Sequence, residues 1–339
     1  MRRRSEAVTI AMLGRAACAA MLVALAAGPA AAQEKIAVKF DFLPYGSHAP
    51  FYLAKEKGWY KDAGVEPSFD DGQGSQAAIQ LITGGRIDVA YVAMASVIIA
   101  RDKGAPVKAI GGVLRKNDFG VLVDAASDIY KPKDLEGKVL YFSPPSSETL
   151  YMDLFFRLNG VDKSKVKLTS IDLSTKVSTY MAGKGDAMFV PIPIYTIEAA
   201  PRKSRGLLFA DYGIPMPGFG IISSDSIIKA KPKALGGFTA AVQRAWTEVA
   251  RDPKMLEEAI DALFANRPQA KLNRTIVTQQ LKSVLPFLVT EATRDRPMLW
   301  QSPTEWEGTI KINEEAGAIK KGSNPAEYYT NEFVPDRRR

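Results

Sequence analysis

The sequence predicts an α/β protein made of two lobes with a ligand cleft between them. Short runs of β-forming residues alternate with helical stretches, which is the pattern of α/β proteins with mostly parallel sheets. The alternation occurs in two successive sets, and the chain beyond residue 231 is mainly helical. Ligands of open α/β sheets bind beyond the carboxyl ends of the strands, so two such sheets predict a cleft between the lobes.

The first set contains four predicted strands and three predicted helices. The strands are runs rich in β-branched, aromatic and other apolar residues, at 36–42, 65–69, 87–92 and 107–113. The helices lie between the strands, at 50–57, 75–83 and 96–102. Gly58 and Gly84 follow the first two helices directly, and glycine is a common helix terminator.

The second set is predicted to hold five strands and two helices, before four closing helices. The strands are at 119–123, 138–142, 166–170, 187–190 and 207–209, and the helices at 148–159 and 174–181. The closing helices are at 235–251, 254–265, 273–285 and 302–316, and we expect them to pack back on the first lobe. Crossings at 114–120 and 211–220 divide the chain into a first lobe, 33–116 with 218–339, and a second lobe, 117–217.

The first 32 residues predict a secretory signal peptide. Four arginines accompany an apolar run over residues 16–27, which is too short to remain in a bilayer as a spanning helix. Small residues then occupy the −3 and −1 positions of a cleavage site after Ala32, and polar Gln33 and Glu34 follow. We therefore expect cleavage after Ala32 and a periplasmic protein. The alternative is an uncleaved membrane anchor.

The one cysteine of the chain, Cys18, lies inside this leader. A lipoprotein signal requires an aliphatic residue three places before the cysteine, and Arg15 stands there, which excludes a lipid anchor. The mature chain then has no cysteine, so disulfides, thiolate metal sites and a cysteine nucleophile are excluded. Its stability must come from a sizeable apolar core, which a chain of this length supplies.

The formal charge of +8 is dispersed along the chain. Removal of the leader, which holds four arginines and one glutamate, lowers it by three. Several lysines stand next to acids, as in Lys55-Glu56 and Lys61-Asp62, which is typical of a solvated surface. We expect no nucleic-acid partner and a monomeric protein.

The sequence carries no motif for covalent catalysis. His48 is the sole histidine, which excludes a metal site with two histidines and a second imidazole for proton transfer. Gly-x-Ser-x-Gly does not occur, and Gly72-Gln-Gly-Ser75 lacks the third glycine of a dinucleotide loop. We expect no metal, no cofactor and a role in binding rather than catalysis.

Two turns from strand to helix carry residues suited to a polar ligand. Gly74 and Ser75 open one predicted helix and Ser146 and Ser147 another, so free backbone N–H groups and hydroxyls face the sheet edge. In the alternative interpretation, Ser75 and Ser147 only cap their helices, which is the commoner use of such serines.

The segment 41–52 delivers an aromatic ring and an imidazole directly after the first strand. Tyr45 and His48 are predicted to hold a flat ligand by stacking and by a hydrogen bond to its edge. Alternatively, His48 caps the following helix and Tyr45 packs at the surface. The position after the carboxyl end of a strand favours the ligand role.

This segment also resembles the opening of a known family. Its pattern, Asp41-Phe-x-Pro-x-x-x-His48-x-x-x-Tyr52-x-Ala-x-x-x-Gly-Trp-Tyr60, is similar to that of periplasmic binding proteins for thiamine-pyrimidine precursors, within a wider group that includes sulfonate and nitrate binders. Further segments fit the same family, so the resemblance covers nearly the whole mature chain: 84–90, 134–138, 183–187 and 328–331.

The resemblance implies a type II periplasmic-binding-protein fold that closes about a hinge. It also implies an ABC importer with permease and ATPase subunits as the partner. Carried over by position, the ligand-binding residues form two walls of the cleft. The first wall holds Pro44, Tyr45, His48, Gly74, Ser75, Met94 and Ser96, and the second Ser146, Ser147, Glu148 and Tyr195.

One departure from the family leaves the ligand open. Residues 190–194 are apolar where family members often place an acid, and a carboxylate is the best partner for an aminopyrimidine. If Glu148 or Asp41 substitutes for that acid, the ligand is a thiamine pyrimidine precursor or a similar flat heteroaromatic. Otherwise it is a sulfonate or an aromatic carboxylate.

Two other functions use the same fold. The resemblance extends to eukaryotic pyrimidine synthases that consume a histidine, for which His48 is the candidate. Those enzymes are cytoplasmic and carry a cysteine-rich iron motif that this chain lacks. A ligand-sensing partner of a membrane receptor is the other alternative. The main prediction is a non-enzymatic importer subunit.

Overall fold

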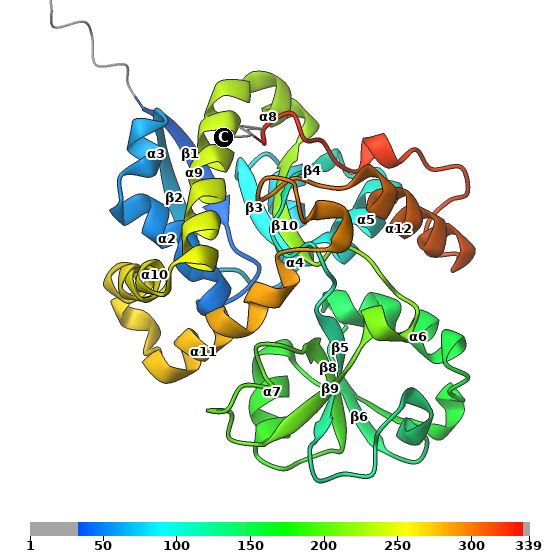
Figure 1. The fold of residues 1–339 in the computed structure, drawn as a ribbon. Coiled ribbons are helices and arrows are strands. Elements are labelled where there is room, and N and C mark those ends of the chain that lie inside the picture. The colour runs from blue at the N-terminus through cyan, green and yellow to red at the C-terminus, as the bar shows by residue number, and fades with distance from the viewer. Residues whose placement is uncertain (1–32, 145, 335–339) are drawn as a thin grey trace, which may run out of the picture. The chain divides into compact units, whose positions relative to one another are not determined.

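The computed structural model describes residues 33–144 and 146–334 (Figure 1). The predicted signal peptide and its cleavage site after Ala32 lie outside the described residues. The described chain contains two five-stranded sheets, which the chain builds almost in succession. Their strand orders are β2-β1-β3-β10-β4 and β7-β6-β8-β5-β9.

The strands overlap the predicted runs, with ends that differ by up to three residues, apart from one that the sequence did not predict. The first sheet consists of β1 (Glu34–Lys39), β2 (Val65–Asp70), β3 (Val89–Ala93), β4 (Val107–Gly112) and β10 (Phe219–Ser224). The second consists of β5 (Phe119–Asp124), β6 (Val139–Phe142), β7 (Lys167–Ser170), β8 (Ala187–Pro191) and β9 (Ser204–Leu208).

Each sheet is mixed, because one strand runs against its neighbours. Strand β10 pairs antiparallel with β3 and β4, and β5 pairs antiparallel with β8 and β9. The sequence predicted mostly parallel sheets and placed no strand at 219–224. All six residues of β10 are buried, so the strand lacks the alternation of polar and apolar residues by which strands are usually recognised.

The two antiparallel strands follow the points where the chain crosses between the sheets. The crossings lie side by side, since the Gly218 N–H donates to the Leu114 carbonyl over 2.8 Å and the Leu114 N–H donates to the Phe219 carbonyl over 2.8 Å. An added Cβ at Gly218 would lie 2.6 Å from the Lys116 carbonyl oxygen, so only glycine permits this close approach.

Helices pack around both sheets. The first set contributes α2 (Ala49–Glu56), α3 (Trp59–Asp62), α4 (Ser75–Thr83) and α5 (Met94–Asp102). The second set contributes α6 (Met152–Leu158), which follows a 3₁₀ turn η3 (Ser147–Tyr151), and α7 (Leu173–Met181). The closing part contains α8 (Asp225–Ala230), α9 (Pro232–Arg251), α10 (Pro253–Asn266), α11 (Arg274–Val284) and α12 (Pro303–Glu315).

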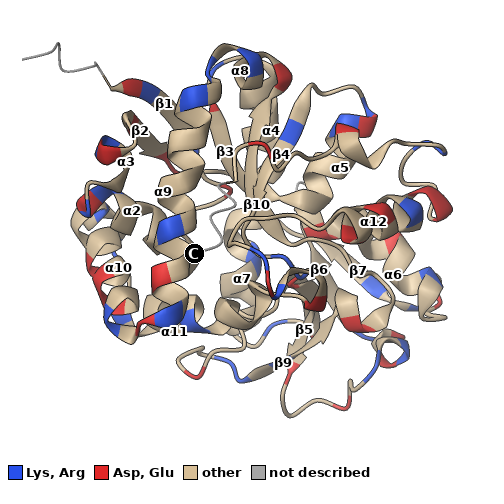
Figure 2. Ribbon diagram, turned by 45° about the horizontal axis from the view of Figure 1, so that its top comes forward, with Lys and Arg blue, Asp and Glu red and all other residues tan. Residues whose placement is uncertain are grey.

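The packing of α9 shows why the closing helices return to the first sheet. Its apolar residues recur every three or four positions, and Phe238, Val242, Trp246 and Val249 are buried on one face. This helix and α10 pack against α2 (Figure 1). Charged residues lie on the helices, the loops and the outer strands such as β1, whereas β3 and β10 carry none (Figure 2).

Candidate ligand-binding site

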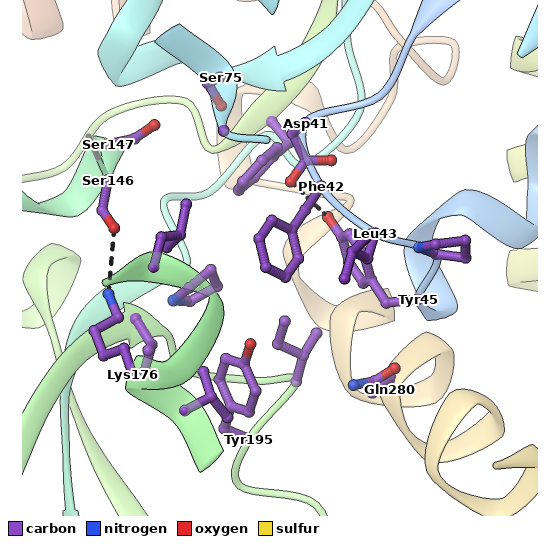
Figure 3. A pocket seen from close by; sticks show the side chains of 18 of the residues that line it. Asp41, Phe42, Leu43, Tyr45, Ser75, Ser146, Ser147, Lys176, Tyr195 and Gln280 are labelled. Carbon is purple, nitrogen blue, oxygen red and sulfur yellow. Dashed lines mark hydrogen bonds between the residues drawn. The ribbon is translucent and has the colours of Figure 1, made fainter. Parts of the chain in front are cut away.

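A cavity of about 420 Å³ is lined by segments that belong to both sheets (Figure 3). This size is within the range of small-molecule sites. The lining is mainly apolar and aromatic, as expected where a flat ring is held. Its apolar and aromatic members include Phe42, Leu43, Tyr45, Phe119, Leu173, Val177, Val190, Ile194, Tyr195, Phe219, Leu272, Ile276 and Val277.

Most of the residues that the sequence selected lie at this cavity. Those that line it are Pro44, Tyr45, Gly74, Ser75, Ser146, Ser147, Glu148 and Tyr195. His48, Met94 and Ser96 are not in the lining. Met94 is fully buried, and the Ser96 hydroxyl is 2.8 Å from that of Ser147, so Ser96 supports a lining residue from behind.

The imidazole of His48 holds the carboxylate of Asp41, the first of two that line the cavity. Its ring is fully buried and stacks on Phe40 with centroids 4.1 Å apart, so it has no surface left for a ligand. Its Nε2 lies 2.9 Å from Oδ1 of Asp41, and Asp41 lines the cavity. His48 precedes α2 at the N-cap position, but its side chain makes no bond to that helix, so it does not act as the cap proposed in the alternative interpretation.

Tyr45 completes this arrangement at the cavity wall. Its hydroxyl donates to Oδ2 of Asp41 over 3.4 Å (Figure 3). The pKa of Tyr45 is raised well above its usual value, first by desolvation and then by the Asp41 charge, so the hydroxyl remains a donor at neutral pH. Asp41 therefore presents a carboxylate whose orientation is set from two sides.

Lys176 holds the second carboxylate of the cavity. Its buried ammonium donates to Oε1 of Glu148 over 2.7 Å and to the Phe189 carbonyl over 2.7 Å. It also donates to the Ser146 hydroxyl over 3.3 Å (Figure 3). These three bonds use all three donors of the ammonium. Lys176 therefore orients Glu148 and Ser146 and has no donor left for an anionic ligand.

The two carboxylates come from different sheets. Asp41 follows β1 of the first sheet, and Glu148 lies in η3, which follows β6 of the second. Each is held by a buried basic side chain, His48 or Lys176. Ionised carboxylates only accept hydrogen bonds, so this site favours a flat ligand with N–H or O–H donors at its edges.

The predicted serine turns are present, but their hydroxyls do not cap the helices. Ser75 is the first residue of α4, and its Oγ accepts from the Ala93 N–H over 3.1 Å. Gly74 precedes it with a φ of 108°, a conformation that strongly favours glycine. The N–H groups of Gly74 and Ser146 donate to the carbonyls of Asp41 and Ser143, so these turns are held by backbone bonds and their hydroxyls by neighbouring elements.

The sequence analysis missed the aromatic pair contributed by the crossings. Phe119 and Phe219 open β5 and β10, line the cavity, and touch edge to face with centroids 5.6 Å apart. Each is followed by glycine, at 120 and 220. This repeated Phe-Gly step after both crossings was a usable sequence signal.

The sequence analysis also missed α7 and α11 as cavity walls. Lys176 looked like an ordinary exposed lysine of a short helix. Asn273, Ile276, Val277 and Gln280 of the α11 region line the cavity. Their spacing of three, four and seven residues marks one helical face. That spacing identifies the face but not what it contacts.

A third carboxyl group lies buried close to the other two. Asp118 is 2% exposed, and its Oδ1 has no hydrogen-bond partner among the residues that the structure describes. Burial, and then the charges of Asp41 and Glu148, raise the pKa of Asp118 to about 8. Asp118 is therefore mostly protonated at neutral pH.

This raised pKa predicts a pH-dependent stability. Between the unfolded value near 4 and about 8, the folded chain keeps a proton that the unfolded chain releases. The free energy of unfolding therefore decreases as the pH rises, by at most about 1.4 kcal/mol per pH unit from this group.

In urea unfolding from pH 5 to 8, the Asp118→Asn variant should lose less stability than the parent, and the exposed-site variant Asp62→Asn should follow the parent. Parallel curves for the parent and Asp118→Asn would contradict the prediction.

In residues 33–144 and 146–334, no group of three or more histidine, cysteine or acidic residues is arranged to hold a metal ion. Over the same part of the chain, no helix combines the length and the apolar character needed to cross a bilayer.

Comparisons with known proteins relate the chain to binding proteins. Residues 46–256 match the family model described as NMT1/THI5 like. The chain is 25% identical over 313 residues to the riboflavin-binding protein RibY of Chloroflexus aurantiacus, covering 89% of this chain and 86% of that protein. It is 24% identical over 285 residues to the formylaminopyrimidine-binding protein of Halalkalibacterium halodurans, covering 82% and 84%.

The chain is also similar to a protein that is named as an enzyme and to a solved structure of a binding protein. A 4-amino-5-hydroxymethyl-2-methylpyrimidine phosphate synthase of Legionella pneumophila is 24% identical over 307 residues, covering 86% of this chain and 89% of that protein. The alkanesulfonate-binding protein SsuA of Xanthomonas axonopodis superimposes with a TM-score of 0.65 at 16% identity, covering 87% of this chain and 98% of that one. The structural similarity confirms the predicted α/β periplasmic-binding-protein fold.

Proposed function

Because the chain belongs to the NMT1/THI5-like family, we propose that it is the extracytoplasmic substrate-binding subunit of an ABC importer. In this proposal it captures a small organic solute in the periplasm and delivers it to permease and ATPase subunits. The two relatives named as binding proteins support this role, since each aligns with more than four fifths of the chain.

The proposed ligand is a flat heteroaromatic with hydrogen-bond donors at its edge, such as a thiamine pyrimidine precursor. The observation that carries this choice is the pair of carboxylates, Asp41 and Glu148, set in an aromatic lining. An amino group and a protonated ring nitrogen donate to a carboxylate in the plane of the ring. The relative named for formylaminopyrimidine supports the same class of ligand.

An anionic ligand is the weaker alternative. A sulfonate or aromatic carboxylate would face the charges of Asp41 and Glu148, while the donors of Lys176 are already used. The other lysine of the lining, Lys271, is exposed. Repulsion between an anionic ligand and these two carboxylates disfavours binding unless their charges are neutralised.

Closure is proposed to occur between residues 33–116 with 218–339 and residues 117–217. Asp41 and Glu148 stand on different sides of this division, so a ligand that contacts both favours the closed form by its differential affinity. The paired crossings, which include Leu114 and Gly218, are the proposed hinge.

We propose that the chain binds its ligand without converting it. The relative named as a synthase makes the enzymatic alternative specific. In that alternative His48 would be consumed, but its ring is fully buried behind Asp41 and Tyr45 and lies outside the cavity lining. That position supports a positioning role for His48.

A thermal-shift experiment tests the proposed function. Purified protein is heated with 4-amino-5-hydroxymethyl-2-methylpyrimidine, riboflavin, an alkanesulfonate, nitrate or benzoate. A ligand at one hundred times its Kd adds about 2.7 kcal/mol of stability, which raises the Tm by about 5 °C. We expect this shift with the pyrimidine or riboflavin, and we expect chromatography to recover the ligand unchanged.

Two results would overturn the proposal in different ways. A shift given by the sulfonate, nitrate or benzoate alone would replace the ligand class and keep the binding role. Steady conversion of a bound compound would replace the binding role by an enzymatic one.

A further inference from the structure

A groove of about 740 Å³, separate from the ligand cavity, is lined by the C-terminal half of α9 and by the segment 289–298. Five arginines contribute to it: Arg115, Arg244, Arg251, Arg294 and Arg296. Two acidic residues, Glu248 and Asp295, also line it. The groove therefore carries an excess of positive charge that the ligand cavity does not use.

The exposed arginines of this groove have no ionic partners. Across the described chain, no carboxylate lies within 4.0 Å of Arg244, Arg251, Arg294 or Arg296. Lysines and arginines elsewhere commonly do have such partners, as Arg202 does with Asp124 over 2.7 Å. Four unpaired guanidinium groups in one concavity form a site that is complementary to negative charge.

Two of these arginines are held in place by aromatic rings. The guanidinium of Arg244 lies 4.2 Å from the ring centroid of Trp59, and that of Arg296 lies 4.5 Å from that of Trp300. Stacking fixes the plane of a guanidinium group while leaving its N–H edge free to bind. These side chains therefore lose less conformational freedom when a partner binds than unstacked arginine side chains would.

The fifth arginine is buried and has no carboxylate in ion-pair contact. Arg115 is 5% exposed and donates to backbone carbonyls, including those of Leu288 over 2.5 Å and Pro297 over 3.1 Å. No carboxylate lies within 4.0 Å of it in the described chain, although buried charges are usually paired. The charge of Glu305 acts on Arg115 from outside the groove lining, and a negative group in the groove would add a second such interaction.

We propose that this groove binds an extended acidic segment of a partner protein. Arg244 and Arg251 are seven residues apart on α9, which separates them by about 10 Å along one face. An extended segment advances about 3.3 Å per residue, so carboxylates two and four residues apart on one face lie about 6.6 and 13.2 Å apart and bracket this span. A segment with two such carboxylates can contact both arginines at once.

The concave form of the site favours a protein segment over a membrane surface. A lipid surface is broad and contacts protruding basic residues together with apolar ones. Here the arginines surround a hollow, and the exposed apolar residues of the lining are Val289 and the small Ala250. The groove also shares no residue with the ligand cavity, so the inference does not depend on the ligand class.

The test uses the full protein and a labelled peptide of alternating glutamate and glycine, six residues long. A peptide with glutamine in place of glutamate is the matched control. Fluorescence anisotropy should detect the glutamate peptide alone, and its affinity should fall as salt rises from 0.05 to 0.5 M. We expect Arg251→Ala or Arg294→Ala to weaken binding about threefold each and the double variant about tenfold.

Controls separate this inference from general charge effects. Arg86→Ala removes an exposed arginine far from the groove residues in sequence and should leave peptide affinity unchanged. Equal binding of the glutamine peptide, or an equal loss in Arg86→Ala, overturns the proposal. Two further results overturn the proposal if the peptide does not bind. Sedimentation with phosphatidylglycerol vesicles that requires Arg251 and Arg294 would favour a lipid surface, and binding of pyrophosphate that requires them would favour small anions. Ligand affinity of the cavity should be the same in all variants.

Discussion

Replacement of Asp41 by asparagine is expected to lower ligand affinity about thirtyfold. Asp41 lines the cavity, and His48 and Tyr45 hold its carboxylate in one orientation. A hydrogen bond to a charged group is worth roughly 1.5–3 kcal/mol, and 2 kcal/mol corresponds to about thirtyfold in Kd. Asparagine keeps the shape but removes the charge and turns one acceptor into a donor. Isothermal titration with the ligand identified by thermal shift measures the effect.

The matched control is Asp70→Asn, at the exposed end of the neighbouring strand β2. It removes a carboxylate from the same edge of the first sheet but not from the cavity lining. Its ligand affinity should equal that of the parent. If Asp41→Asn binds as tightly as the parent does, the ligand does not donate to Asp41, and the proposed recognition is wrong.

Replacement of Lys176 by methionine is expected to lower the free energy of unfolding by about 3–5 kcal/mol. The change leaves the Glu148 carboxylate buried without its positive partner, and it also leaves the Phe189 carbonyl without a donor. The side chains of Lys176 and Glu148 are 1% and 6% exposed, so water cannot replace the lost bonds without rearrangement. Urea unfolding measures the loss.

Two comparison variants test this explanation. Lys163 and Asp153 form an ion pair of the same 2.7 Å length, but their side chains are 50% and 69% exposed. Lys163→Met should therefore cost no more than about 1 kcal/mol. The double variant Lys176→Met with Glu148→Gln removes both charges and should recover most of the lost stability. A cost for Lys176→Met as small as that for Lys163→Met would show that Glu148 is well solvated.

The sequence predicted most of the strands and helices of the described chain, because each element carries its own local signal. The apolar spacing of α9 and the β-branched run of β4 are examples. The short helices α3 and α8 were not predicted, and neither was the strand β10. Its six buried residues show no alternation, and its place between β3 and β4 depends on segments more than one hundred residues earlier in the chain.

The candidate site was predicted in part. The residues of the strand-to-helix turns, such as Ser75 and Ser147, were found because such turns meet at the edge of a sheet. His48 was selected for its chemistry, but the structure places its ring against Phe40 and leaves Asp41 at the cavity. Lys176 was missed because a lone lysine on a short helix gives no indication of burial.

The sequence by itself determined the α/β class, the order of the elements and the residue types available for binding, since these follow from local periodicity and composition. The tertiary structure alone decided which side chains face the cavity. Asp41 and Glu148 are 107 positions apart, and each obtains its orientation from a buried basic residue on another element. Such a pairing depends on how distant segments pack, and no local pattern in the chain records it.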